Sequence, residues 1–471
     1  MEEGGALVQV LVVATFVVIF LRDELRGPRG GAAASAWGVL LFPAAIVLLW
    51  ASAQLFMRSQ ARRIDRTGDH RAVMRAFQAA RLARGAGFVT HAGAVLWLGW
   101  LDAIRGAIGN IVLLDEVLAA APMLTLIVML WWSEFPIDRR LREASILGDL
   151  DRGGLGVSLP TRGQHVLASL RNTLGLTLLP ILLISGWEEL SQVVARSLRA
   201  DQPMVLVGLR VAGAILILTL MPAAATRLWD TTALGPGPLR DGILELAKDA
   251  KVRVRELLVW RTHFAMINGA AMGLVARFRY VLLTDALLDR LPAEQVRAVA
   301  AHEFGHVRRR HLPWLLVGGL SILVVSAFAA EHAVRSLAWV PAAWAELLAL
   351  TLSLIAAFFA FGFVSRRFEW QADAFAAQLL SPAEGDGQRT VRPAAVTAMI
   401  AALETVARLS HIPPDRHSWR HGSIRARQIS LMSLSGRPVD RLGPDRAAAW
   451  TKVAIALAAL ASVAIIAADS L

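Results

Sequence analysis

The sequence contains no cysteine among its 471 residues. Disulfide bonds and cysteine-ligated zinc are therefore excluded, while the redox compartment stays undetermined. Charged residues are also few, at 18% of the chain, whereas hydrophobic residues make up 56% and the mean hydropathy is +0.52. An ordinary soluble protein of this length is less apolar, so the composition is typical of a polytopic membrane protein.

The N-terminus lacks the basic start and the small-residue cleavage site of a secretory signal peptide. Two glutamates precede the first apolar run instead, and we expect that run to be a retained span. Several runs are shorter than the ~20 residues that cross a bilayer, so we expect about eight or nine transmembrane helices. The apolar runs are 6–21, 36–57, 87–104, 111–132, 168–187, 204–224, 312–331, 342–364 and 449–468.

The net charge of +12 is carried almost wholly by arginine outside the apolar runs. Placement at a membrane surface explains this charge, so we expect the lipid bilayer and no nucleic acid as a partner. The arginines of 58–84 and 139–162 predict that both loops are cytoplasmic. By alternation, 227–311 and 365–446 are cytoplasmic as well, although Arg22, Arg26 and Arg29 would then lie outside, against the same rule.

The segment 299–311 reads V-A-A-H-E-F-G-H-V-R-R-R-H. His302 and His306 are four residues apart, so on a helix their imidazoles project from one face and can share a zinc ion. Glu303 then lies beside that ion as a candidate general base. The alternative is a helix whose histidines only pack or bond to carbonyls. The pattern favours a zinc hydrolase with one Zn²⁺ per chain.

A catalytic zinc ion needs a third protein ligand and an open position for water. His311 is the nearest candidate, but nine residues after His302 on a continuous helix it would lie on the opposite face. Further along the chain, Glu369 and Asp373 are four residues apart on one face of an expected helix. We expect Glu369 to bind the metal and Asp373 to orient a ligand histidine from behind it.

Two apolar runs separate His306 from Glu369, and an even number of crossings returns the chain to the side it left. Both halves of the expected site can therefore meet. The expected domains are 1–224 with about six spans, 225–311 as the first catalytic part, 312–364 as a membrane hairpin, 365–447 as the second catalytic part, and 448–471 as a C-terminal span.

H-E-F-G-H followed, after two apolar runs, by S-R-R-F-E-W-Q-A-D-A-F-A resembles the integral-membrane zinc metallopeptidases that include the CAAX prenyl proteases and HtpX. The resemblance covers about Leu239 to Ile429 and not the first 224 residues. It implies a fold that is mainly α, with a small α+β zincin-like catalytic domain on the cytoplasmic side. Periodicity within this part predicts helices at 239–250 and 393–409 and short strands at 253–260, 264–270 and 277–283.

Two further segments resemble parts of that family. Asn268, Gly269 and Ala270 are similar to its Asn-Ala strand, whose edge could bind the substrate backbone by strand addition; Asn268 could equally hold a turn. His421 and Arg427 resemble a histidine and an arginine that border the active site in relatives, where the histidine stabilises the oxyanion. Here Gly422 replaces the usual proline, and His417 is a competing candidate.

The expected reaction is hydrolysis of a peptide bond. Zinc held by the two histidines and Glu369 would lower the pKa of water and polarise the scissile carbonyl, while Glu303 would transfer protons. The resemblance implies substrates that are membrane-associated: misfolded membrane proteins, or prenylated proteins. The composition suggests a bacterial inner membrane. A signalling protease that cuts one cytoplasmic regulator is an alternative, and a scaffold or transporter with a relic zinc site is a remote one.

Overall fold

The computed structural model describes residues 2–26, 36–150, 159–197, 203–262, 264, 266–337, 339–382, 389–410 and 412–469. The chain divides into two compact units, Met1–Trp229 and Asp230–Leu471, and each is described by itself. Both are built mainly of helices, and the second also contains one small mixed sheet. The expected fold class, mainly α with a small α+β part, is confirmed. The finer five-part division of the chain stays a prediction.

The first unit is a set of helices that pack around a shared apolar core, which includes Phe16, Phe42, Met123 and Leu126. A π-helical segment, η1, joins two of these helices without a break. The elements are α1 (Glu2–Arg26), α2 (Ala36–Thr67), α3 (His70–Leu96), α4 (Trp100–Ile108), α5 (Leu114–Leu150), α6 (Arg162–Ser169), η1 (Leu170–Gly175), α7 (Leu176–Ser197) and α8 (Pro203–Leu228).

The third apolar run is bent rather than straight. α3 ends at Leu96 and α4 begins at Trp100, with an angle of 61° between them. Gly99, between the two helices, has a φ of 71°, a left-handed conformation that glycine adopts at little cost. The run therefore forms either one broken span or a re-entrant loop.

Within the described residues, seven helices are long and apolar enough to cross a membrane, and the bent pair raises the number to eight. The first apolar run lies in α1, whose apolar part Leu7–Arg22 is shorter than the other candidate spans. The chain is thus a multi-pass membrane protein. Of the expected eight or nine spans, the structure supports eight when the bent pair is counted as one span.

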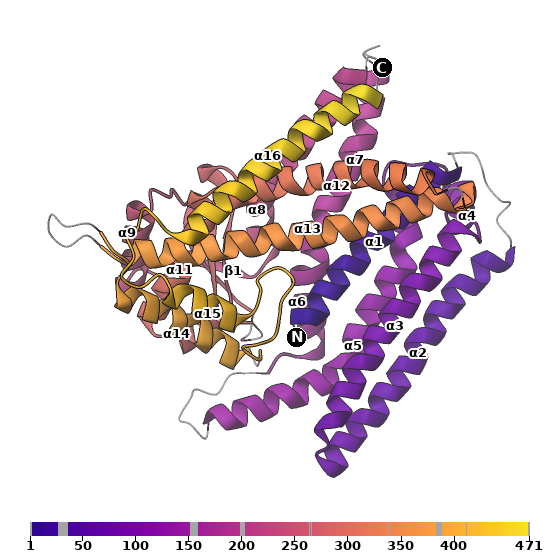
Figure 1. Cartoon of the computed structure of the whole chain (residues 1–471). Coiled ribbons are helices and arrows are strands. Elements are labelled where there is room, and N and C mark those ends of the chain that lie inside the picture. Colours follow the sequence, from indigo (N-terminus) through magenta and orange to yellow (C-terminus); the bar gives the residue numbers. More distant parts are fainter. Residues whose placement is uncertain are drawn as a thin grey trace. The chain divides into compact units, whose positions relative to one another are not determined.

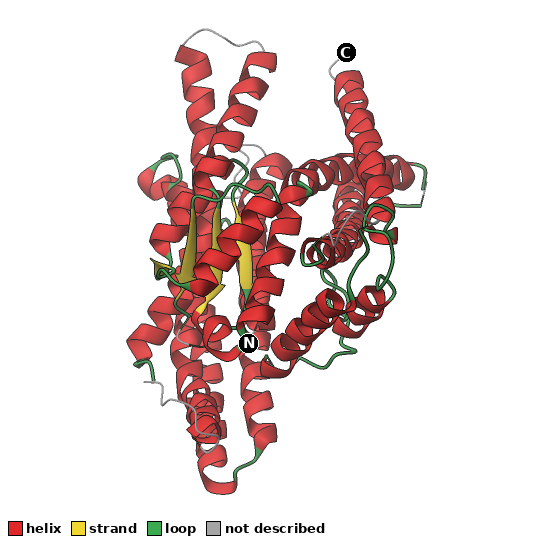
Figure 2. Ribbon diagram, turned by 90° about the vertical axis from the view of Figure 1, so that its left-hand side faces the viewer, coloured by secondary structure: helices red, strands yellow, loops and turns green. Residues whose placement is uncertain are grey.

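The second unit combines a four-stranded sheet with helices (Figure 2). Its elements are β1 (Thr231–Ala233), α9 (Pro238–Asp249), β2 (Glu256–Trp260), β3 (Gly269–Met272), η2 (Ala276–Phe278), β4 (Tyr280–Thr284), α10 (Asp285–Arg290), α11 (Ala293–Arg308), α12 (His311–Arg335), α13 (Ala342–Leu379), α14 (Pro393–Leu409), α15 (Ile424–Met432) and α16 (Gly443–Asp469).

The strands lie in the order β1-β2-β4-β3, so β3 is an edge strand. β2 and β4 are parallel, while β1 and β3 pair antiparallel with their neighbours. The expected strand 264–270 was placed too early, because Thr262 Oγ1 and Phe264 N donate to the Asp285 carboxylate and hold that segment in a turn. β1 was not expected from the sequence at all.

Three long helices of the second unit, α12, α13 and α16, lie against one another (Figure 1). α13 is continuous over 38 residues, so the eighth apolar run and the segment that carries Glu369 form a single helix. α11 covers the sheet through Val296, Ala300 and Phe304, which share a buried core with the strands. The metal-ligand candidates therefore lie on two rigid helices, one packed on the sheet and one continuous with a membrane span.

Candidate metal centre

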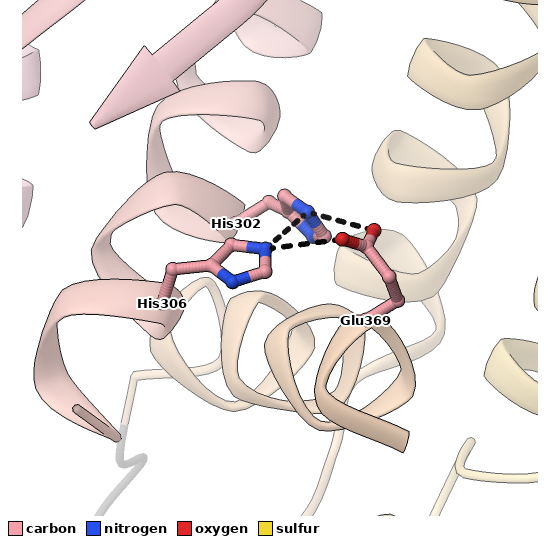
Figure 3. Close-up of side chains that lie close together, drawn as sticks. All are labelled: His302, His306 and Glu369. Carbon is pink, nitrogen blue, oxygen red and sulfur yellow. Dashed lines mark hydrogen bonds and ion pairs between the residues drawn. The ribbon is translucent and has the colours of Figure 1, made fainter. Parts of the chain in front are cut away.

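α11 presents His302 and His306 from one face, one turn apart, as their spacing predicts. Their Nε2 atoms are 3.2 Å apart. Glu369 comes from α13, and its carboxylate oxygens lie 3.7 Å from Nε2 of His302 and 3.6 Å from Nε2 of His306 (Figure 3). One ligand atom from each of the three residues lies within 4.8 Å of the others. The structure therefore brings together the three residues proposed as ligands.

A glycine between the two histidines allows the helices to approach this closely. A Cβ atom at Gly305 would lie 3.1 Å from both Cα and the carbonyl oxygen of Ala372. Real Cβ atoms rarely come this close to backbone, so any larger residue at 305 would push α11 away from α13. The close contact between Gly305 on α11 and Ala372 on α13 thus sets the distance between the paired histidines and Glu369.

The donor atoms of the three residues lie close to the spacing of a tetrahedral zinc ion. Ligand atoms about 2.0–2.2 Å from a metal at tetrahedral angles are roughly 3.4 Å from one another. The two Nε2 atoms are 3.2 Å apart, and each lies 3.6–3.7 Å from a Glu369 oxygen, Oε2 for His302 and Oε1 for His306. Two imidazoles and one carboxylate are also the donor set of many catalytic zinc sites. The residues present therefore fit a zinc ion with one position left open.

Asp373, one turn after Glu369 on α13, fixes the orientation of His302. Nδ1 of His302 lies 2.9 Å from Asp373 Oδ1, and a carboxylate can only accept, so Nδ1 carries the proton. Arg427 from α15 grips the same carboxylate in a two-point interaction, with Nε and Nη2 donating at 2.8 and 2.6 Å. In the neutral ring, Nε2 of His302 is left with a lone pair directed at the site.

A second chain of contacts fixes His306 in the same way. Asp445 accepts from Gln371 Nε2 at 2.7 Å, so the Gln371 carbonyl faces Nε2 of His311, 2.9 Å away, and that nitrogen must be the donor. Nδ1 of neutral His311 then accepts from Nδ1 of His306, at 3.0 Å. His306 is consequently protonated on Nδ1, and its Nε2 presents a second lone pair to the site.

The environment shifts the pKa values of the α11 side chains in ways that suit metal binding and proton transfer. Burial lowers the pKa of His306 to about 4, which keeps it neutral. Burial also opposes the charged form of His302, but its contact with Asp373 outweighs this and raises the pKa. Burial raises the pKa of Glu303, and a carboxylate with a raised pKa is a better proton acceptor.

Glu303 lies between the metal-ligand candidates and the sheet. Its Oε2 accepts from the backbone N–H of Ala271 in β3 at 2.8 Å. β3 passes directly over α11: a Cβ atom at Gly269 would lie 2.7 Å from Val299 Cγ1. Glycine at 269 is therefore required for the strand to lie this close to the helix.

Asn268, Gly269 and Ala270 lie at the start of this edge strand. The carbonyl of Asn268 accepts from Thr284 N, so alternation along the antiparallel pair turns the backbone groups of Gly269 away from β4. The side chain of Asn268 is exposed. The three residues are placed where an extended peptide could pair with the sheet, and their role stays a prediction.

The structure separates the two candidate histidines near the C-terminal end of the family resemblance. His421 places Nδ1 3.0 Å from Glu369 Oε1, with about half of its side chain exposed. His417 is exposed and makes no contact with the site among the described residues. Gly422 has a φ of +76°, which the usual proline could not adopt, so the substitution reflects a different local turn.

Arg427 is deeply buried and turned towards α13 rather than towards open space. Besides gripping Asp373, its Nη1 lies 3.6 Å from Glu369 Oε2. The neighbouring carboxylates raise its pKa despite burial, so the guanidinium stays charged. This geometry suits a residue that positions the carboxylates more than one that contacts substrate.

The sequence argument missed His311, Gln371 and Asp445. It assumed a continuous helix, on which His311 would lie on the opposite face from His302. α11 instead ends at Arg308, Arg310 is left-handed with a φ of 56°, and α12 begins at His311 with its ring against His306. The run of arginines at 308–310 was the available signal that the helix ends there.

Residues 237–421 match the family model described as Peptidase family M48. The chain is 34% identical over 95 residues to a protein named Protease HtpX homolog from Aeropyrum pernix, a match over 20% of this chain and 28% of that protein. It is 27% identical over 192 residues to Protease HtpX from Hahella chejuensis, over 38% and 58% of the two chains. The matches span about a quarter to three-fifths of the length of these relatives.

Among solved structures, the chain is similar to the crystal structure of S. mikatae Ste24p, with 16% identity and a TM-score of 0.45 over 84% of this chain and 99% of that one. The sequence matches carry the assignment, because they coincide with the segment that contains both motifs. Residues 237–421, which carry the paired histidines on α11 and the two acidic residues on α13, are thus similar to peptidase family M48.

Proposed function

We propose that this chain is a zinc metalloendopeptidase that hydrolyses peptide bonds in membrane or membrane-associated proteins. The observation that carries the proposal is the convergence of His302, His306 and Glu369 on one point, with the Glu303 carboxylate beside it. The match of residues 237–421 to the model of peptidase family M48 supports the same reaction.

The three converging residues would hold the ion. Bound zinc supplies Lewis acidity to a scissile carbonyl and increases the acidity of water. Glu303, whose pKa burial raises, accepts a proton from the attacking water and returns it to the leaving amine. Asp373 and His311 hold the two imidazoles in the tautomers that the site needs.

Two groups at the site are available to the substrate. The free edge of β3 can pair with an extended peptide, which fixes the scissile bond beside Glu303. His421 is half exposed and 3.0 Å from Glu369, so it can donate a hydrogen bond to an oxyanion that forms there.

The test compares two glutamates on the same helix. Glu303→Gln should reduce proteolysis by the membrane-reconstituted full chain by about 10²–10⁴-fold, the usual contribution of a general base. Zinc content should stay at one per chain, because Glu303 is not among the ligands. Glu294→Gln is the matched control, since Glu294 is exposed at the start of α11. Unchanged turnover in Glu303→Gln would refute the proposed role.

We propose protein quality control as the cellular role, on the basis of the relatives named Protease HtpX. Cleavage of an unfolded, casein-like substrate together with misfolded membrane proteins supports it. Cleavage of a single regulator and nothing else would indicate a signalling protease, and a requirement for a prenylated C-terminus would indicate processing of lipidated proteins. Purified protein without zinc would favour the non-enzymatic scaffold.

We also propose that the site lies on the cytoplasmic side of a bacterial inner membrane. The absence of cysteine allows a clean test, because one introduced cysteine is the sole target for a maleimide. Ser435→Cys, in an exposed turn of the second unit, should resist an impermeant maleimide in intact cells. Asn110→Cys, in the exposed loop after α4, should be labelled. The reverse pattern would invert the proposed orientation.

A further inference from the structure

A cavity of about 400 Å³ lies in the first unit, between α2, α5 and α6. No acidic side chain lines it, and four of its lining residues are arginines: Arg58, Arg62, Arg140 and Arg162. Apolar residues, among them Leu55, Met57 and Pro136, line the rest of the wall together with Gln54 and Ser133. The cavity therefore joins a strongly basic surface to a hydrophobic one.

The arginines are not equally neutralised. Arg140 forms a two-point ion pair with Asp65, with both N···O distances 2.6 Å. Within the described part of the chain, Arg58, Arg62 and Arg162 have no carboxylate within ion-pair distance. Three uncompensated positive charges thus line one cavity, an arrangement that repels itself unless an anion enters.

Two of these guanidinium groups are held in place. Arg162 lies over the ring of Trp132, 4.7 Å from its centroid, and its Nε is buried without an acceptor. A buried donor left unpaired costs about 1–3 kcal/mol. Arg58 is oriented by the buried Gln54, whose carbonyl, in the amide orientation that pairs donors with acceptors, lies 3.0 Å from Arg58 Nη2. A fixed pair of arginines is suited to phosphate, which accepts several charge-assisted hydrogen bonds.

The cavity also lies where the apolar part of α2 gives way to charged residues, as at the headgroup level of a bilayer. α2 is apolar as far as Met57, and its charged residues begin at Arg58. Trp132, in the middle of α5 and beside the lining residue Ser133, is 45% exposed, as expected for an aromatic side chain at a membrane interface. A role as topology anchors explains exposed arginines such as Arg66, but it does not explain why Nε of Arg162 is buried without an acceptor.

We propose that this cavity binds the phosphodiester headgroup of an anionic phospholipid, with Arg58 and Arg162 on the phosphate oxygens and the acyl chain against the apolar wall. The apolar part of the wall and the interfacial depth favour a lipid over a free phosphate ion. The site lies wholly in Met1–Trp229, outside the segment matched by the peptidase family, so it is independent of the proposed hydrolysis.

The test is native mass spectrometry of the purified full chain in detergent, titrated with phosphatidylglycerol or with phosphatidylcholine of the same acyl chains. We expect one phosphatidylglycerol to bind at concentrations where phosphatidylcholine does not. Arg58→Gln and Arg162→Gln should each weaken phosphatidylglycerol binding by about tenfold or more, because each removes a charge-assisted hydrogen bond. Arg66→Gln is the matched control on α2 and should change the affinity by less than about twofold.

Three outcomes would overturn the proposal. The first is equal affinity for the two lipids. The second is full phosphatidylglycerol affinity in Arg58→Gln, whose side chain is exposed and whose loss leaves the core intact. The third is inorganic phosphate that displaces the lipid at equal concentration, which would make the cavity a site for a free anion. Arg162→Lys keeps the charge and should bind more tightly than Arg162→Gln, which separates loss of the ligand contact from misfolding.

Discussion

Both units of this chain bury charged side chains, but they arrange them in different ways. In the first unit Arg84 and Glu134 form a separate pair at 2.7 Å, and Arg105 bridges Asp115 and Glu116. In the second unit Glu369, Asp373 and Arg427 lie together with the paired histidines around one point. Separate pairs neutralise charge between helices, whereas the cluster leaves several donor atoms directed at a common position.

The count of charges makes the difference sharper. The buried pair of Arg84 with Glu134 is neutral by itself. Around the metal-ligand candidates there are three carboxylates, from Glu303, Glu369 and Asp373, and one guanidinium, from Arg427. With all of them ionised and the imidazoles neutral, two negative charges remain, and a divalent cation balances them. Excess charge combined with donor atoms that converge on one point, and not burial itself, distinguishes the candidate site from a structural ion pair such as Arg84 with Glu134.

The largest expected effect breaks a pair in the first unit. Arg84→Met leaves Glu134 buried without its partner and should destabilise the protein by about 3–5 kcal/mol. The double variant Arg84→Met/Glu134→Leu removes both charges and should recover most of that loss. Thermal and denaturant unfolding of the full chain in detergent measures both. A single variant no less stable than the double one would contradict the view that these pairs serve only to neutralise charge.

Replacing one buried carboxylate by its amide in each unit distinguishes a carboxylate that supports the metal from one that only stabilises the fold. Asp373 and Glu134 are both buried and both paired with arginine. Asp373→Asn should weaken zinc affinity by about 10–100-fold, as expected when the carboxylate behind a ligand histidine is lost. Glu134→Gln should lower stability and leave zinc affinity unchanged. Competition with a chromophoric chelator measures the affinity, and equal zinc affinities in the two variants would remove the distinction.

The sequence predicted the residues that are fixed by local spacing. His302 and His306, and likewise Glu369 and Asp373, are four apart, and helical periodicity alone puts each pair on one face. The expected helices 239–250 and 393–409 also agree with α9 and α14 to within a residue or so. Patterns of this kind need no knowledge of the rest of the fold.

Two kinds of contact could not be predicted in this way: those that depend on a break in a helix, and those between residues far apart in the sequence. The left-handed residue Arg310 redirects the chain and brings His311 back to His306, which no periodicity indicates. Arg84 and Glu134 are 50 positions apart, so nothing in the sequence pairs them. β1 has only three residues and forms only because β2 offers it a partner.

Acidification should weaken metal binding, because a bound proton competes for each ligand nitrogen. The pKa of His302 is raised above 6.5, so it is the first ligand to take up a proton as the pH falls. Burial holds the pKa of His306 at about 4, so it stays neutral until the solution is much more acidic. Zinc affinity should therefore fall about tenfold per pH unit from near neutrality down to about pH 4, and more steeply below.

Zinc titration at constant ionic strength over this pH range measures the slope. Asp373→Asn removes the carboxylate that raises the pKa of His302, so the fall in affinity should begin at a lower pH in that variant. Glu134→Gln, in the first unit, should not change the pH dependence of zinc affinity. If wild-type zinc binding released two protons per ion over the whole pH range, the two histidines would titrate together. That result would contradict their different environments.

The smallest effect concerns the residue that the sequence placed on the wrong helix face. His311 accepts from His306 as a neutral group, whereas Asp373 supports His302 as a charged one. A neutral hydrogen bond contributes about 0.5–1.5 kcal/mol, so His311→Phe should weaken zinc affinity by about tenfold or less. Phenylalanine keeps the ring that stacks on Phe368 at 4.5 Å, which limits the loss of packing.

His332→Phe is the matched control for this change, because His332 is an exposed histidine on the same helix, α12. It should leave zinc affinity unaltered. If His311→Phe also leaves zinc affinity unchanged, His306 needs no partner to hold its tautomer. Asp373 would then be the one residue whose contact with a ligand histidine strengthens zinc binding. If it weakens zinc as much as Asp373→Asn, the chain through Gln371 to Asp445 transmits negative charge to His306 as effectively as a direct carboxylate contact.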